Sequence, residues 1–263
     1  MHIHRPKPLH GLRDVLGEIG IIVVGILIAL ALEQGVEALR AHQEAQETDR
    51  ALQREVRTDL GEAIQGVIAN GCYRARIAEL TRKLTAPGDT WQGEYEPPSV
   101  DRFGGQPAVA APVLPIAFGT MTHNLWDSPA VTSGLSHLDA SRAHRYSDIY
   151  RYVAALQGVT EDIMARESEL QPLAFDQTLD PAARREYLRS LTRLDQDVYY
   201  GYNITGFVVE RARQNGIEPD AADVANRFAV IRSHLGACVQ PYAPPSGIRD
   251  WAERLDRADE ASR

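Results

Sequence analysis

Hydrophobic residues are concentrated near the start of the chain, in a segment without a polar face. Between Ile19 and Leu32 the sequence has fourteen residues and no charge. With Leu16 and Gly17 included, a helix over this segment would be roughly 25 Å long, slightly less than the hydrocarbon thickness of a membrane. The pattern predicts a transmembrane helix over 15–34, in direct contact with the lipid bilayer.

Three interpretations of this segment remain open. A soluble core helix is disfavoured, because the segment is apolar on every side. A cleaved signal peptide agrees with the preceding basic residues and with the small-x-small pattern Ala29-Leu30-Ala31, which places cleavage after Ala31. An uncleaved anchor is favoured, because Asp14 and Glu18 border the segment and the helical pattern continues beyond Ala31.

Charges before the segment predict the orientation of an uncleaved anchor. Residues 1–14 hold three basic residues and one acidic residue, a formal charge of +2. Because basic residues favour the cytoplasmic side, we expect a short cytoplasmic tail over 1–14 and export of everything after the helix. Gly25 and Ala29 form a small-xxx-small pair, which is typical of sites where a second membrane helix packs closely.

Helical periodicity continues through most of the remaining chain. Few apolar residues but many good helix formers occupy 35–50, which predicts a solvated helical stalk. Apolar residues at helical spacing then return, with an interruption at Asn70-Gly71, and begin a domain over 51–263. A further short amphipathic helix is expected around Trp251 to Leu255.

Local signals mark where the later helices begin and end. Asp139, Asp180 and Asp220 are each placed to cap a helix, and Pro181 after Asp180 fits the first helical position. Asn215-Gly216 predicts a helix end. No run of alternating residues is long enough for a sheet, so the predicted fold class is all-α, an antiparallel helical bundle on a stalk.

A long loop rich in proline and glycine interrupts the helices over 86–115. It holds six prolines and four glycines, which exclude a regular helix. Its length is unusual in a compact domain, and such loops often cover or bind something.

Composition and motifs exclude several classes of function. The 263 residues are 44% hydrophobic and 24% charged, as in ordinary globular proteins, and the net charge of -8 disfavours a nucleic-acid surface. Nucleophile-elbow, phosphate-binding and dinucleotide-binding motifs are missing. No metal-site spacing is matched by the pair His123 and Asp127 or by the pair His137 and His144. We therefore predict a protein that is not an enzyme, with no catalytic residue, cofactor or metal.

The two cysteines, Cys72 and Cys238, are far apart in the chain. An exported location would allow them to form a disulfide that closes a loop of about 167 residues. Two buried free thiols are the alternative.

Aromatic residues provide a candidate binding surface. Tyrosine combines apolar bulk with a hydroxyl and suits recognition. The candidates are Trp126, Tyr146, Tyr150, Tyr199 and Tyr202. The competing interpretation is that these rings fill the bundle and direct their hydroxyls to its edge.

The N-terminal sequence KPLHGLRDVLGEIGIIVVGILIALALEQ resembles the signature of a family of small, uncharacterised bacterial proteins. Weaker similarity extends to NGCYRARIAEL, LWDSPAVTSGLSHLDASRAHRYSDIYRYV and ACVQPYAP. The resemblance implies a single-pass protein of the bacterial inner membrane with a helical periplasmic domain. It implies no activity.

These patterns favour a non-enzymatic interaction or assembly component of the cell envelope. Its expected partner is another membrane or envelope protein, or a second copy of itself. The alternative is an exported domain that binds or senses a small molecule, with Trp126, the long loop and the tyrosines around a cavity.

Overall fold

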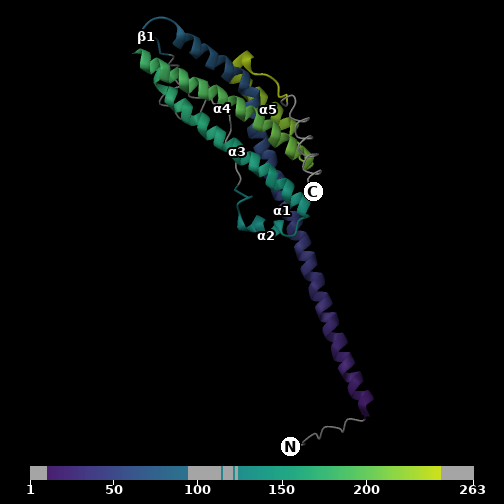
Figure 1. Cartoon of the computed structure of the whole chain (residues 1–263). Helices are drawn as coiled ribbons and strands as arrows, with labels where there is room; N and C mark the ends of the chain where they lie inside the picture. The colour runs from purple at the N-terminus through teal and green to yellow at the C-terminus, as the bar shows by residue number, and fades with distance from the viewer. Residues whose placement is uncertain (1–10, 94–113, 115–120, 122–123, 244–263) are drawn as a thin grey trace, which may run out of the picture.

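The chain forms one very long helix with a helical bundle packed on its C-terminal half (Figure 1). The computed structural model describes residues 11–93, 114, 121 and 124–243. The helices are α1 (Gly11–Thr85), α2 (Pro129–Leu135), α3 (Ala140–Leu170), α4 (Pro181–Gln214) and α5 (Ala221–Leu235). Two 3-10 turns, η2 (Gln171–Ala174) and η3 (Gly236–Cys238), follow α3 and α5. The all-α prediction is confirmed.

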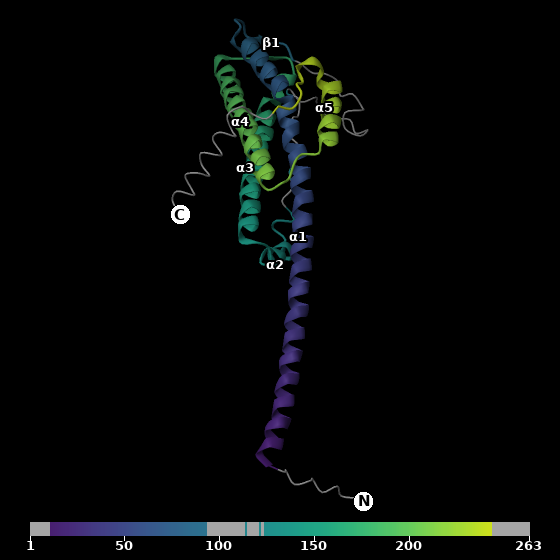
Figure 2. The same ribbon diagram turned by 90° about the vertical axis from the view of Figure 1, so that its right-hand side faces the viewer.

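The bundle is built around the upper half of α1. Helices α3 and α4 form an antiparallel pair, and α4 also packs along α1. Figure 2 shows α5 on the other side of α1, away from the α3–α4 pair. The short α2 contacts α1 at the lower end of the domain, nearest the N-terminal segment.

Each predicted aspartate cap is present. The Asp139 side chain accepts a hydrogen bond from the Arg142 N–H, and Asp180 and Asp220 accept the first amides of α4 and α5 in the same way. Asn215 caps the C-terminal end of α4, and Gly216 follows with a φ of +74°, a conformation that favours glycine. These caps depend on neighbours in sequence, which explains why sequence alone located them.

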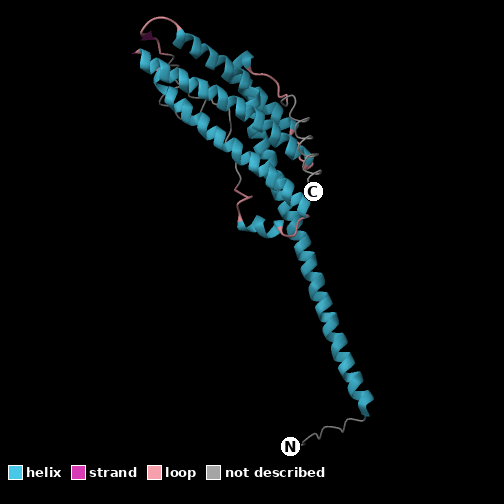
Figure 3. Ribbon diagram, viewed as in Figure 1, coloured by secondary structure: helices cyan, strands magenta, loops and turns pink. Residues whose placement is uncertain are grey.

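The interruption expected at Asn70-Gly71 is absent, because α1 continues through both residues (Figure 3). A helical glycine costs about 1 kcal/mol relative to alanine. Here the glycine permits a close approach: a Cβ atom at Gly71 would lie 2.8 Å from the Cys238 carbonyl oxygen. The glycine therefore reflects tertiary packing and not a helix end.

A small strand pair fastens the far end of the bundle. β1 (Thr90–Trp91) pairs antiparallel with β2 (Gln177–Thr178), although no strand is predicted from the sequence pattern. The buried Trp91 donates its indole N–H to the Leu173 carbonyl at 2.8 Å. This contact joins the end of α1 to the connection between α3 and α4.

The core lies between α1, α3 and α4. Helix α1 buries one face from Leu52 to Leu84, and the apolar stripe predicted for α3 is buried as expected. A smaller cluster under α5 includes Ile64, Ile68 and Val239.

The N-terminal part of α1 has no part in that core. Every described side chain from Leu16 to Arg40 is exposed. In the part of the chain that the structure describes, α1 is the one helix long and apolar enough to cross a membrane. Residues 1–10, most of the loop over 86–115 and the expected helix at Trp251 to Leu255 lie outside the described residues.

Candidate functional site

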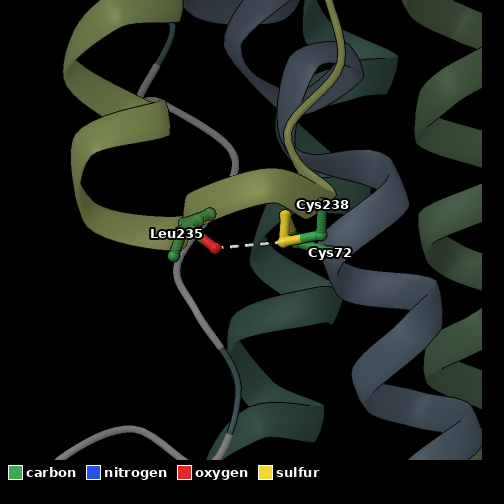
Figure 4. Close-up of a disulfide and its surroundings, with 3 residues drawn as sticks. All are labelled: Cys72, Leu235 and Cys238. Atoms are coloured by element: carbon green, nitrogen blue, oxygen red, sulfur yellow. Dashed lines mark hydrogen bonds between the residues drawn. A yellow bond between two sulfur atoms is a disulfide. The ribbon is translucent and has the colours of Figure 1, made fainter.

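A disulfide joins Cys72 of α1 to Cys238 of η3, as the first of the two cysteine interpretations predicts (Figure 4). The two Cα atoms are 4.9 Å apart, and 166 positions separate the cysteines in sequence. The Cys238 sulfur also lies 3.2 Å from the Leu235 carbonyl oxygen at the end of α5. The bridge therefore holds α5 and the segment after it against α1.

The five candidate aromatic residues do not form one surface. Tyr146 and Tyr150 are buried, and Trp126 is partly buried with its ring stacked on Tyr150 at 4.7 Å. Tyr199 is 60% exposed on α4, whereas Tyr202 lines a groove described below. Tyr146 and Tyr150 fill the core-facing stripe of α3, as the competing interpretation expects, but their hydroxyls reach carboxylates of α1 and not the edge of the bundle.

The buried tyrosines bind carboxylates on α1. Tyr150 donates its hydroxyl to Glu55 Oε2 at 2.6 Å, and Tyr146 donates to Asp49 Oδ1 at 2.9 Å. Arg142 of α3 adds an ion pair to Asp49 at 2.6 Å. Burial, followed by the hydrogen bond to a carboxylate, raises the pKa of both tyrosine hydroxyls. Both hydroxyls remain protonated donors at neutral pH, so these contacts fix the lower end of α3 on α1.

An open groove with a volume of about 850 Å³ lies between α1 and α4. Ile77 and Leu191, both buried, form part of its lining. The segment after the disulfide contributes Gln240 and Pro241. The groove thus depends on two helices and on the bridge that positions this segment.

Charged groups give the groove a mixed polar character. Arg74 of α1 lies 3.6 Å from Asp195 of α4, and both side chains line the groove. Arg82 also lines it and forms no ion pair within the described ranges. The hydroxyl of Tyr202 and the side chain of Asn70 add hydrogen-bonding groups. This arrangement can bind a polar or anionic molecule.

Glu167 is a carboxyl group whose pKa is raised in the folded protein. It lies on α3, and the buried Tyr73 of α1 donates its hydroxyl to Oε1 at 2.8 Å. Burial raises the pKa of Glu167 to about 7. The groove lining does not include Glu167, so we assign this carboxyl group to helix packing.

No set of three or more potential metal ligands occurs among the described residues. His137 lies 3.9 Å from Glu44 and His144 lies 3.9 Å from Asp148, so the two histidines contact different carboxylates. His123 is outside the described residues.

Gly25 and Ala29, predicted to allow helix packing, lie on the exposed part of α1. A Cβ atom at Gly25 would meet no other atom of the chain within 4 Å. The space beside this pair is therefore open to another helix.

Comparison with known protein families, with curated proteins and with solved structures returned no match.

Proposed function

We propose that this chain is a single-pass membrane protein of the bacterial cell envelope and acts without catalysis, as an interaction or assembly component. The N-terminus would be cytoplasmic and the bundle periplasmic. The observation that carries the proposal is the continuity of α1, which is exposed and apolar near its N-terminus and is the central helix of the bundle beyond Ala45. The N-terminal resemblance to anchored bacterial proteins supports the same conclusion.

The stalk would hold the bundle at a fixed distance from the membrane. From Glu33, the first charge after the apolar run, to Ala45, the first buried residue, α1 covers roughly 18 Å. A continuous helix of this length is stiff, so anchor and bundle would move as one body. Such a protein is suited to present a partner site at a set height above the bilayer.

The disulfide supports a periplasmic bundle, because structural disulfides persist in oxidising compartments. The test is an intact mass from native membranes, with free thiols alkylated before reduction and again after it. We expect a full-length protein whose two cysteines react only after reduction. A mass that begins at Leu32 would refute the anchor, and two free thiols would refute the orientation.

The assembly role needs its own test. Crosslinking in membranes, followed by purification in mild detergent, should return a specific product larger than the monomer. Repeated recovery of the monomer alone would refute this role while leaving the anchor in place.

A second candidate function rests on the groove between α1 and α4. The exposed Arg74 and Arg82 beside an apolar lining favour a small anionic molecule with a hydrophobic part. A thermal-shift screen tests it, because a ligand that binds only the native state raises stability. A ligand of this kind should no longer raise the melting temperature of the Arg82→Glu variant. It should still raise that of the control Arg50→Glu, because Arg50 lies on the stalk side of the domain and outside the groove. No shift across a broad set of organic anions would refute the groove as a binding site.

A further inference from the structure

One face of α1 remains apolar after the helix has left the region of the proposed membrane span. Leu32 is 67% exposed, Val36 is 48% exposed and Leu39 is 58% exposed. Glu33, Glu37 and Arg40 lie on the same turns. Because charges are costly inside the hydrocarbon, these turns lie outside it. Val36 and Leu39 are therefore apolar side chains in a polar setting, with no covering contact from the described part of their own chain.

These residues continue the small-residue pair of the membrane segment. The positions Gly25, Ala29, Leu32, Val36 and Leu39 are separated by four, three, four and three residues. This alternation is the spacing of a helix that packs lengthwise against another helix. Over the membrane part the small residues permit close approach, and over the stalk the larger ones can cover each other.

The apolar stripe, defined as these five residues, faces away from the α3–α4 pair. At 3.6 residues per turn, Val36 and Leu39 project from the side of α1 opposite to the buried Ala45 and Leu52. Helix α5 packs on the stripe's side of α1 at Gly61 and Glu62, roughly 33 Å beyond Leu39. A second helix can therefore lie on the stripe from Gly25 to Leu39 without meeting the bundle helices of the same chain.

Charge limits how far such a contact can extend. Arg50, Arg54 and Arg57 follow on the same face of α1 and are exposed. Two copies would bring these like charges together and repel each other. Between the stripe and the arginines, Gln43 and Gln46 occupy the same spacing, and amides can pair with copies of themselves.

We infer that α1 pairs in parallel with α1 of a second copy along the stripe from Gly25 to Leu39. A second copy with the same orientation presents each stripe residue at the same depth, so small residues meet small residues and leucines meet leucines without any shift. The inference rests on the proposed anchor and deepens the assembly role by naming the partner.

Cysteine crosslinking of the full-length protein in membranes tests the pairing. Single variants Val36→Cys and Leu39→Cys place a thiol on the stripe, and Gln34→Cys and Ala38→Cys place one on the opposite face. The two native cysteines are already joined to each other and do not interfere. We expect a dimer on a non-reducing gel after mild oxidation for positions 36 and 39, and monomer for positions 34 and 38.

The outcomes separate this inference from the proposed function. Equal dimer at all four positions, or at none, would overturn the parallel pair. A product that joins position 36 to a different protein, without dimer, would overturn the pair and keep the assembly role. Loss of all variants from the membrane fraction would refute both the parallel pair and the proposed membrane anchor.

A second pair of variants tests the close approach within the membrane. In the Val36→Cys background, Gly25→Leu should remove the dimer, because a large side chain at the contact separates the helices. Gly20→Leu is the matched control, since Gly20 lies on the opposite face and a Cβ atom there is equally unobstructed. An equal effect of the two changes would overturn the assignment of Gly25 to the contact.

Discussion

Replacing Glu167 by glutamine removes a half-buried carboxyl group that is held by the hydroxyl of Tyr73. Tyr73 donates a hydrogen bond to it, which lowers its pKa, but the effect of burial is larger and raises the pKa to about 7. An unfolded glutamate has a pKa near 4.5. Between these two values the folded protein binds more protons than the unfolded chain, so the free energy of unfolding falls as pH rises.

The size of this effect follows from the two pKa values. Each pH unit of difference corresponds to about 1.4 kcal/mol, so the loss between pH 4.5 and pH 8 is about 3 kcal/mol. The stabilising contribution is complete below pH 4.5 and is lost as pH rises through 7. Glutamine does not titrate, so Glu167→Gln should match the wild type near pH 4.5 and exceed it at pH 8.

The assay is urea unfolding of the full-length protein in detergent, followed by tryptophan fluorescence at pH 5 and pH 8. Glu169→Gln is the matched control, because Glu169 is exposed and its pKa is lowered by hydrogen bonds from Ser190 and Arg166. A difference between Glu167→Gln and wild type that is the same at both pH values would show that the Glu167 carboxyl group does not make stability depend on pH.

Two further predictions concern contacts that hold the domain on α1. Replacing Cys72 and Cys238 by serine should lower the free energy of unfolding by about 5 kcal/mol in the chain-entropy description, because the bridge closes a loop of 166 positions. Urea unfolding with and without a reductant checks this, and a wild type insensitive to reduction would contradict it. Tyr150→Phe should cost about 2 kcal/mol, because Glu55 loses a buried charged hydrogen bond. The exposed Tyr199→Phe should change the free energy of unfolding by less than about 0.5 kcal/mol in the same urea titration, and equal effects of the two tyrosine changes would contradict the role of Tyr150.

Sequence patterns correctly predicted the structural features that depend on residues close together in the chain. The caps at Asp139, Asp180 and Asp220 and the buried stripe of α3 each follow from a few consecutive turns of one helix. The hydrophobicity of the N-terminal segment is also a local property, because it follows from the composition of one continuous stretch.

Features that join distant segments were not predictable in the same way. The groove requires α1, α4 and the segment after Cys238, and no local pattern gives their relative positions. Asn70-Gly71 predicted an interruption because the reason for the glycine, the Cys238 carbonyl oxygen, lies far along the chain. One missed signal was available: Glu55 falls on the same helical face as Leu52 and Val56, which marks it as a buried acid in need of a donor.

The continuity of α1 raises the question of whether stalk and bundle fold as one unit. The side chains from Leu16 to Arg40 make no buried contact, whereas those from Leu52 to Leu84 form one wall of the core. Helices in proteins gain most of their stability from packing of an apolar face. The stalk should therefore contribute little to the stability of the bundle, although both belong to one helix.

Proline substitutions at two alanines of α1 test this division. Proline inside a helix costs about 3 kcal/mol or more, because it removes a hydrogen bond and clashes with the preceding turn. Ala63→Pro, within the fully buried face, should unfold the bundle or lower its stability by at least that amount. Ala38→Pro, in the exposed stalk, should leave the urea midpoint of the bundle unchanged, because the broken turn touches nothing in it. Equal losses for the two variants would mean that the stalk and the bundle unfold together, and that the rod and the domain are a single cooperative unit.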